Sequence, residues 1–171
     1  MANNLIIYYS RKGENYVGGT ITSLEKGNSE RCAEYIRNAV GGDLFEVRPV
    51  KSYPSDYMAC TEEAKAELKA GARPELAEYL NSIDGYDNVF VCGPCWWGTF
   101  PMPVFSLLEP LNFAGKKVMV LMTHEGSGLG GSERDMKKLC RGAKFGKALA
   151  IQGGTAARAE STVAAWARSQ V

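Results

Sequence analysis

Unbroken apolar runs alternate with polar, helix-forming stretches along the chain. The three strongest runs lie at residues 5–9, 88–92 and 118–122, and all are rich in Val, Ile, Leu, Met or aromatic residues. An apolar run without alternation is typical of a strand that is covered on both faces, as in a parallel sheet. We therefore predict three buried strands at these positions.

The polar stretches between these runs carry the signals of helices. A capping residue at Asn28 or Ser29, followed by apolar positions at helical spacing, predicts a helix that ends before Gly41. Composition and the placement of proline and glycine predict the remaining elements. Helices are expected at residues 56–69, 74–80, 102–110, 132–139 and 158–171, weaker strands at 43–47 and within 144–152, and an excursion or small hairpin at 17–26.

Strands that alternate with helices predict an α/β fold, in which helices cover both faces of a parallel sheet. Right-handed crossover connections leave few topologies for such a sheet. The sequence contains no internal repeat, low-complexity tract or linker, so we expect a single domain over residues 1–171. Ligands of open α/β sheets bind outside the carboxyl ends of the strands, which directs attention to the loops that follow them.

Composition and charge exclude several classes of function. The formal net charge of +1 is too small for a nucleic-acid-binding domain, and no apolar run is long enough to span a membrane. Without a recognisable targeting segment, the cytoplasm is the expected location. The five cysteines are an odd number in a chain too long to need disulfides, so we expect thiols, and no metal-ligand spacing is present.

Three loops at expected strand ends have unusual chemistry. Residues 10–16 combine a hydroxyl, two cations and a glycine, which suits an anion such as a phosphate. Residues 93–99 contain two adjacent tryptophans, which suit stacking on a planar ring. Residues 123–131 are rich in glycine and hydroxyl groups, which permit close backbone contact with the polar edge of a ligand.

With these three loops in register, the chain resembles flavodoxin-like FMN-binding proteins of the short type over nearly its whole length. The resemblance implies a three-layer sandwich around a five-stranded parallel sheet of order 2-1-3-4-5, with FMN as the cofactor. The phosphate-binding pattern of the family, S/T-x-x-G-N-T, is split here into Ser10-Arg11-Lys12-Gly13 and Gly27-Asn28-Ser29, with residues 14–26 as an insertion. The phosphate contacts implied are Ser10, Arg11, Lys12, Asn28 and Ser29, and Glu14 is expected to point away from them.

The other two loops resemble the flavin-binding loops of the same family. The resemblance implies contacts to the ring from Pro94, Cys95, Trp96, Trp97 and Gly98, and contacts to its pyrimidine edge from Thr123, His124, Gly126, Ser127 and Gly128. Flavodoxins often place a second aromatic residue in the last loop, but residues 123–131 contain none. Tyr16 of the insertion is a candidate to cover the open face of the ring.

The tetrapeptide Cys92-Gly93-Pro94-Cys95 also has the form of a thiol–disulfide redox motif. That chemistry needs a helix that begins at the first cysteine, whereas Trp-Trp-Gly and two prolines follow here. We therefore retain this function only as a minor alternative to flavin chemistry. A milder possibility is that Cys95 lies beside the flavin and modulates it or becomes oxidised.

The function that the resemblance implies is electron transport between redox partner proteins or small electron acceptors. The first alternative is an NAD(P)H-dependent FMN oxidoreductase of the quinone reductase type, and the second is a binding module that has lost the flavin. The near-neutral charge counts against a carrier, because carriers of this family are usually acidic. No catalytic residue, nucleic acid or membrane is expected to take part, and we expect a monomer or weak homodimer.

Overall fold

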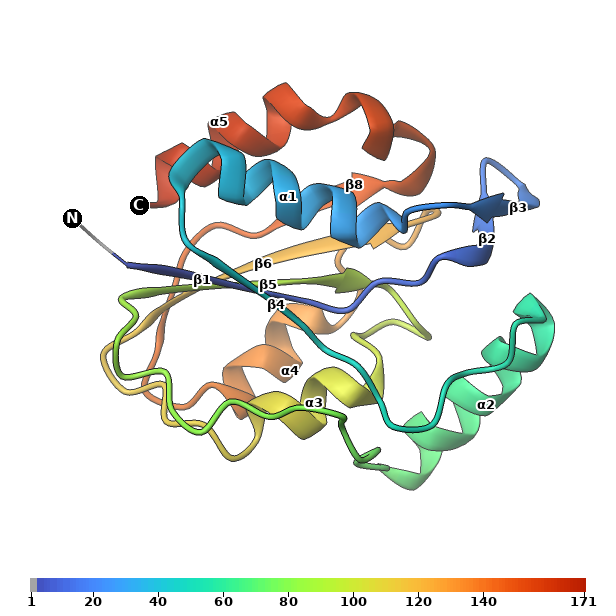
Figure 1. The fold of residues 1–171 in the computed structure, drawn as a ribbon, viewed down its shortest axis with the longest axis horizontal. Coiled ribbons are helices and arrows are strands. Elements are labelled where there is room, and N and C mark those ends of the chain that lie inside the picture. The colour runs from blue at the N-terminus through green and yellow to red at the C-terminus, as the bar shows by residue number, and fades with distance from the viewer. Residues whose placement is uncertain (1–2) are drawn as a thin grey trace.

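The computed structural model describes residues 3–171 and contains a central parallel sheet between two layers of helices (Figure 1). The sheet has the order β4-β1-β5-β6-β7, and β8 also pairs with β6. The strands are β1 (Asn4–Tyr8), β4 (Asp43–Glu46), β5 (Asn88–Pro94), β6 (Lys117–His124), β7 (Lys144–Phe145) and β8 (Leu149–Gln152). All pairs are parallel, and β7 and β8 are two short pieces of one edge. The predicted order 2-1-3-4-5 is therefore confirmed.

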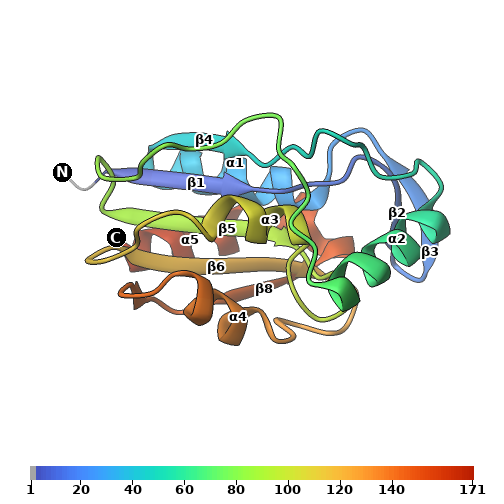
Figure 2. The same cartoon turned by 90° about the horizontal axis from the view of Figure 1, so that it is seen from below.

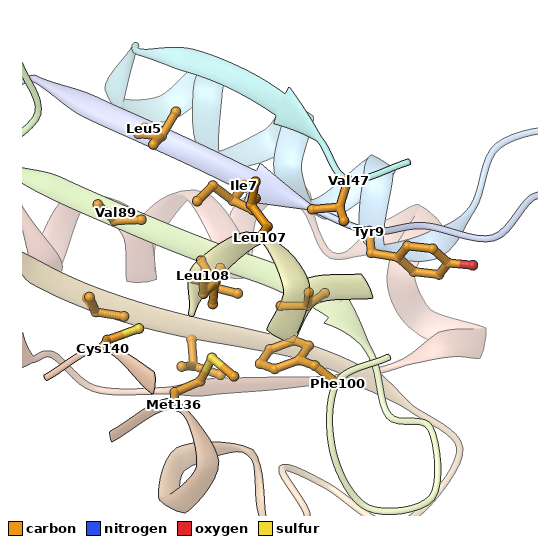
Figure 3. Packing of buried hydrophobic residues seen from close by; sticks show 14 of the residues in the cluster. Leu5, Ile7, Tyr9, Val47, Val89, Phe100, Leu107, Leu108, Met136 and Cys140 are labelled. Atoms are coloured by element: carbon orange, nitrogen blue, oxygen red, sulfur yellow. The ribbon is translucent and has the colours of Figure 1, made fainter. Parts of the chain in front are cut away.

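The apolar run of β1 is unbroken because both of its faces are buried. Leu5 and Ile7 pack into one core with α3 (Met102–Leu108) and α4 (Ser132–Leu139), as Figure 3 shows for Ile7 and its neighbours. Ile6 faces the opposite core, where α1 (Asn28–Val40) and α5 (Glu160–Gln170) cover the sheet. A six-residue 3-10 turn, Gly153–Arg158, connects β8 to α5.

A hairpin and a helix lie beyond the carboxyl ends of the strands. The hairpin is formed by β2 (Gly13–Val17) and β3 (Thr20–Leu24), and the helix is α2 (Tyr57–Ala70). Figures 1 and 2 both place these elements at the end of the molecule to which β1 and β5 point. The hairpin was predicted at residues 17–26, but it begins earlier, so that Tyr16 lies on its first strand.

The expected helix at residues 74–80 is wrong. Leu76 instead forms an antiparallel bridge with Pro49, and the amide of Val50 donates to the carbonyl of Glu75 at 2.8 Å. The amide of Ala77 donates to the carbonyl of Arg48 at the same distance of 2.8 Å. This extended pairing buries Leu76 in the core, a long-range gain that outweighs the local helix signal of Pro74.

No helix within residues 3–171 is both long enough and apolar enough to cross a membrane.

Candidate cofactor site

A cavity of about 570 Å³ opens at the carboxyl ends of β1, β5 and β6. This volume lies within the range of small-molecule and cofactor sites. The cavity is lined by Arg11, Asn15, Tyr16, Ile21, Asn28, Tyr57, Met58, Cys60, Thr61, Ala64, Pro94, Cys95, Trp96, Trp97, Thr123, His124, Glu125, Gly126, Ser127 and Gly153. The lining therefore combines the strand-end loops with the hairpin, from which Tyr16 was expected at the site, and with α2, which the sequence did not connect to the site.

The cavity has two walls of different origin. We call the residues at the strand ends and the start of α1 the inner wall: Asn28, Pro94, Cys95, Trp96, Thr123, His124, Glu125, Gly126, Ser127 and Gly153. The outer wall comprises the hairpin and α2 residues Tyr16, Ile21, Tyr57, Met58, Thr61 and Ala64. Trp97 lies at the junction, because its indole N–H donates to the carbonyl of Thr61 at 2.9 Å.

The first loop and the start of α1 meet as the split pattern predicts. The hydroxyl of Ser10 accepts a hydrogen bond from the amide of Glu30 at 3.0 Å, so Ser10 caps the helix from a distance of 20 residues. Gly27 makes this approach possible, because a Cβ there would lie 2.0 Å from Ser10 Oγ and 2.7 Å from the carbonyl oxygen of Arg11. The N-terminal end of α1 at Asn28 thus faces the cavity, and such an end attracts anions.

Arg11 lines the cavity, but its guanidinium group holds neighbouring backbone. It donates to the carbonyl oxygens of Glu14, Pro54 and Ser55 at 2.8–3.0 Å. The Glu14 carboxylate turns away from the loop and accepts from the amide of Tyr57 at 2.8 Å, as expected for a site that binds an anion. Arg11 and Glu14 together fasten the hairpin to the segment that leads into α2.

Five other predicted contacts lie outside the cavity lining. Lys12 is exposed, and Ser10 is engaged with α1. Ser29 is buried and shares a 2.9 Å hydrogen bond with the hydroxyl of Thr123, which joins α1 to β6. The carbonyl of Gly98 accepts from the amide of Gly131 at 2.6 Å, which joins the second loop to the third. Gly128 also lies in the third loop without lining the cavity.

The two tryptophans of the second loop have separate environments. Trp96 packs edge-to-face against Tyr9 and Tyr53, with ring centroids 5.2 and 5.0 Å away. Trp97 is half-exposed, and the Lys65 ammonium group lies 5.1 Å from the centre of its ring. Among residues 3–171, Trp97 is the only non-glycine residue with a positive φ, at 55°. The ring of Trp97 lies in the wall of the cavity rather than in the core.

The cysteines of the second loop do not have the geometry of a thiol–disulfide centre. Cys92 is fully buried within β5, and burial raises the pKa of its thiol well above the usual value. The next helix, α3, begins only at Met102, so no helix N-terminus activates Cys92. Cys95 is partly buried in the inner wall and accepts a hydrogen bond from the hydroxyl of Ser127 at 3.2 Å. Its thiol is free, as are those of the other four cysteines.

The third loop places a histidine and a carboxylate in the inner wall. The amide of Gly126 donates to Nδ1 of His124 at 2.9 Å, so the neutral imidazole carries its proton on Nε2. The carboxylate of Glu125 accepts from the amide of Gly18 at the hairpin turn, at 3.0 Å. A Cβ at Gly153 would lie 2.4 Å from Glu125 Oε1 and 2.9 Å from the side-chain nitrogen of Asn28, so only glycine leaves space for both.

Within residues 3–171, no group of three or more His, Cys, Asp or Glu residues is arranged to hold a metal ion.

The comparisons with known proteins agree with this geometry. The flavodoxin family model matches residues 22–169. The chain is a member of the flavodoxin family. The match begins inside the insertion and includes the second half of the split phosphate pattern and both flavin-type loops. A search of curated proteins returned no match.

Several solved structures of flavoproteins are similar to this chain over nearly its whole length. A proposed flavoprotein from Bacteroides uniformis ATCC 8492 has a TM-score of 0.75 at 25% identity, with 98% of each chain covered. One from Bacteroides eggerthii DSM 20697 has a TM-score of 0.73 at 25% identity, with 99% of this chain and 98% of the other covered. A flavoprotein from Lactobacillus acidophilus NCFM, solved in complex with FMN, has a TM-score of 0.64 at 19% identity, with 94% and 99% covered.

Membership of the flavodoxin family assigns FMN as the cofactor, and the inner wall fits it. The N-terminal end of α1 at Asn28 is available to a phosphate group. Trp96 and Trp97 supply aromatic surface for a planar ring, and the third loop supplies polar groups for its edge. Close packing at Gly27 and Gly153 keeps side chains out of the space beside Asn28.

Proposed function

We propose that this flavodoxin carries electrons between redox partners through bound FMN. The flavin supplies the redox chemistry, and the chain supplies its position, its surroundings and its access to partners. The proposal rests on the position of the cavity, which opens to the surface beside the half-exposed ring of Trp97. A flavin in the inner wall would therefore have an edge within reach of another protein.

The contacts of the inner wall support a specific orientation of the cofactor. The phosphate group would lie at the N-terminal end of α1, where Asn28 lines the cavity. The ring would lie between Cys95 and Trp96 on one side and the third loop on the other. His124 would then present its Nε2 proton to the polar edge of the ring, because Gly126 occupies Nδ1.

An anaerobic electron-transfer experiment tests this role. FMN-loaded protein is reduced with dithionite and then mixed with cytochrome c in a stopped-flow spectrophotometer. A carrier should reduce two cytochromes per flavin, because FMN releases two electrons and each haem accepts one. The same protein should not be reduced by NADPH alone. Rapid reduction by NADPH would contradict the carrier role.

The size of the cavity supports an NAD(P)H-dependent reductase as the second candidate. An enzyme of this kind needs space beside the flavin for a second molecule, and the outer wall lines such space. The chain would then oxidise NADPH and pass the hydride through the flavin to a small acceptor. Stoichiometric NADPH consumption in the presence of an acceptor, but not without FMN, would establish this alternative.

A further inference from the structure

We propose that the outer wall of the cavity binds a neutral planar aromatic molecule, of the size of a naphthoquinone, next to the cofactor. This inference rests on the proposed position of FMN in the inner wall. It adds a second ligand site, on the hairpin and α2, that belongs to neither the phosphate pattern nor the two flavin-type loops. The argument begins with the distribution of exposed apolar residues.

Exposed apolar side chains are concentrated around this one cavity. Within residues 3–171, eight large hydrophobic residues are exposed, and four of them line the cavity. They are Tyr16, Ile21, Met58 and Trp97, with exposed fractions of 43, 49, 57 and 49%. Apolar surface that gathers in a concave site is typical of a ligand-binding surface, whereas scattered single residues are ordinary.

The aromatic rings of the outer wall, and Trp97 at its junction with the inner wall, are held in place before any ligand arrives. Tyr16 and Tyr57 stack with centroids 6.1 Å apart and ring planes 28° apart. The backbone of Tyr57 is fixed by Glu14, and the indole of Trp97 is fixed by the carbonyl of Thr61. The left-handed backbone of Trp97 is an unfavourable conformation for a bulky residue, and such strain is concentrated at binding sites.

Two polar side chains of the outer side, Asn15 and Thr61, are already hydrogen-bonded within the chain itself. The side-chain amide of Asn15 donates to the carbonyls of Arg11 and Gly13, and the hydroxyl of Thr61 donates to the carbonyl of Met58 at 2.7 Å. Apart from the hydroxyl groups of Tyr16 and Tyr57, this side therefore offers a ligand mainly apolar and aromatic contact. A flat aromatic molecule gains most from such a surface.

The charges around the cavity disfavour an anionic ligand at the outer wall. Arg11 is the only cationic side chain in the lining, and its Nε and Nη2 groups already donate to three backbone carbonyl oxygens. Glu125 adds a negative charge to the opposite wall, and Lys65 lies over the ring of Trp97 rather than in the lining. A dinucleotide would need cations or backbone amides for its phosphates, so a neutral ring fits better than NADPH.

Calorimetric titration of the oxidised, FMN-saturated protein with 1,4-naphthoquinone tests the inference. Because the flavin is oxidised, the measurement reports binding without turnover. Wild-type protein should bind the quinone with a dissociation constant below about 1 mM and NADPH at least tenfold more weakly. Met58→Lys and Ile21→Lys should each weaken quinone binding at least tenfold, because they put a solvated charge on the apolar wall.

Two matched variants control for the added charge. Leu68→Lys lies on the same helix as Met58, and Val50→Lys is an equally exposed apolar position, but neither residue lines the cavity. Both controls should keep quinone affinity within twofold of wild type. All four variants should keep their FMN dissociation constant within threefold, and circular dichroism should confirm that each one is folded.

Three outcomes would overturn the inference. The first is an absence of quinone binding to FMN-saturated wild type, and the second is tighter binding of NADPH than of quinone. The third is an equal loss of FMN and quinone affinity in Met58→Lys, which would assign the outer wall to the flavin itself. Failure of wild type to bind FMN would instead contradict the assignment of the inner wall, and it is read from the separate FMN titration.

Discussion

The inner and outer walls of the cavity are held in place by different kinds of contact. The inner wall follows directly from buried strands, and internal hydrogen bonds such as Ser29–Thr123 join its elements. The outer wall stands on a hairpin outside the central sheet and on a helix that contributes few residues to the core. Its position depends on Glu14, Glu125 and Trp97, which contact distant segments.

This difference indicates a division of roles. A wall built on buried strands keeps one geometry, which suits a cofactor that stays bound. A wall that is exposed and held by single hydrogen bonds suits a ligand that enters and leaves, because few contacts oppose its movement. The following predictions test whether the two walls can be altered separately.

The largest effect is expected from Gly27→Ala, directly before the inner-wall residue Asn28. The new Cβ would collide with Ser10 Oγ and with the backbone oxygen of Arg11, so the start of α1 must move. Displacement of this packed segment should raise the FMN dissociation constant about 100-fold, which corresponds to the usual cost of overpacking. Fluorescence titration with FMN gives the value.

Gly154→Ala is the matched control for Gly27→Ala. A Cβ at Gly154 would have no atom within 4 Å, so this variant should bind FMN as wild type does. If Gly27→Ala also binds FMN with wild-type affinity, the meeting of Ser10 with α1 has no part in cofactor binding.

The next effect concerns the contact between the two walls at Glu125. Glu125→Ala removes the acceptor for the Gly18 amide, which frees the hairpin turn. FMN release should become about fivefold faster, because a hydrogen bond to a charged group no longer closes the cavity. Glu125→Gln retains an acceptor and should release FMN at a rate near that of wild type. Stopped-flow fluorescence measures these rates, and the exposed Glu133→Ala is the control.

Slower release in Glu125→Ala would show that the carboxylate mainly repels the phosphate of FMN. Riboflavin, which lacks that phosphate, separates the two effects. Loss of the hairpin contact should accelerate riboflavin release as well, whereas relief of repulsion should leave riboflavin unchanged.

A smaller effect on both walls is expected at their junction. Trp97→Phe keeps an aromatic ring but loses the indole hydrogen bond to Thr61. The ring should become less ordered, and the affinities for naphthoquinone and FMN should each fall about threefold, the usual net value of one hydrogen bond. Parallel titrations with the two ligands provide the comparison. If Trp97→Phe lowers the affinity for FMN more than tenfold and leaves the affinity for naphthoquinone unchanged, Trp97 belongs to the inner wall alone.

The smallest expected effect is on the free energy of unfolding, and it arises at Glu67 of α2, the helix that carries part of the outer wall. Burial raises the pKa of Glu67 above its usual 4.5, Glu63 adds to this shift, and the hydrogen bond from the Tyr53 hydroxyl partly offsets it. Because the folded-state pKa is raised, the free energy of unfolding falls as the pH rises from 4.5 through the folded pKa. The glutamine of Glu67→Gln does not titrate, so the variant lacks this contribution to the pH dependence of stability.

Urea unfolding of wild type and Glu67→Gln at several pH values measures this difference. The variant should gain stability relative to wild type between pH 4 and pH 7, by no more than about 1 kcal/mol, since Glu67 is only partly buried. If the variant instead loses stability relative to wild type over this pH range, hydrogen bonding, rather than burial, dominates the pKa shift of Glu67.

The parts of this molecule that sequence predicted are those with a strong local signal. The unbroken runs of β1, β5 and β6 specify buried parallel strands, and the carboxyl ends of those strands place the three loops together. The split phosphate pattern also followed from residue types alone. Ser10 and Gly27 indeed meet at the start of α1, although which residues contact FMN remains a prediction.

The outer wall could not be predicted because long-range contacts create it. Met58 and Thr61 lie on a helix whose sequence is typical of a solvated surface, and no local pattern shows that Trp97 approaches Thr61. The prediction of a helix at residues 74–80 was wrong for a related reason, because the bridge between Leu76 and Pro49 overrides a local helix signal. The one available sign was Tyr16, an aromatic residue in an insertion otherwise rich in polar residues.

The most direct test of the account measures both ligands on two variants, Gly27→Ala and Met58→Lys. FMN affinity is titrated first, and naphthoquinone affinity is then measured at saturating FMN. Separate walls predict that Gly27→Ala loses FMN affinity and keeps quinone affinity, whereas Met58→Lys keeps FMN affinity and loses quinone affinity. Parallel loss of both affinities in either variant would contradict the account and show that the cavity is a single site.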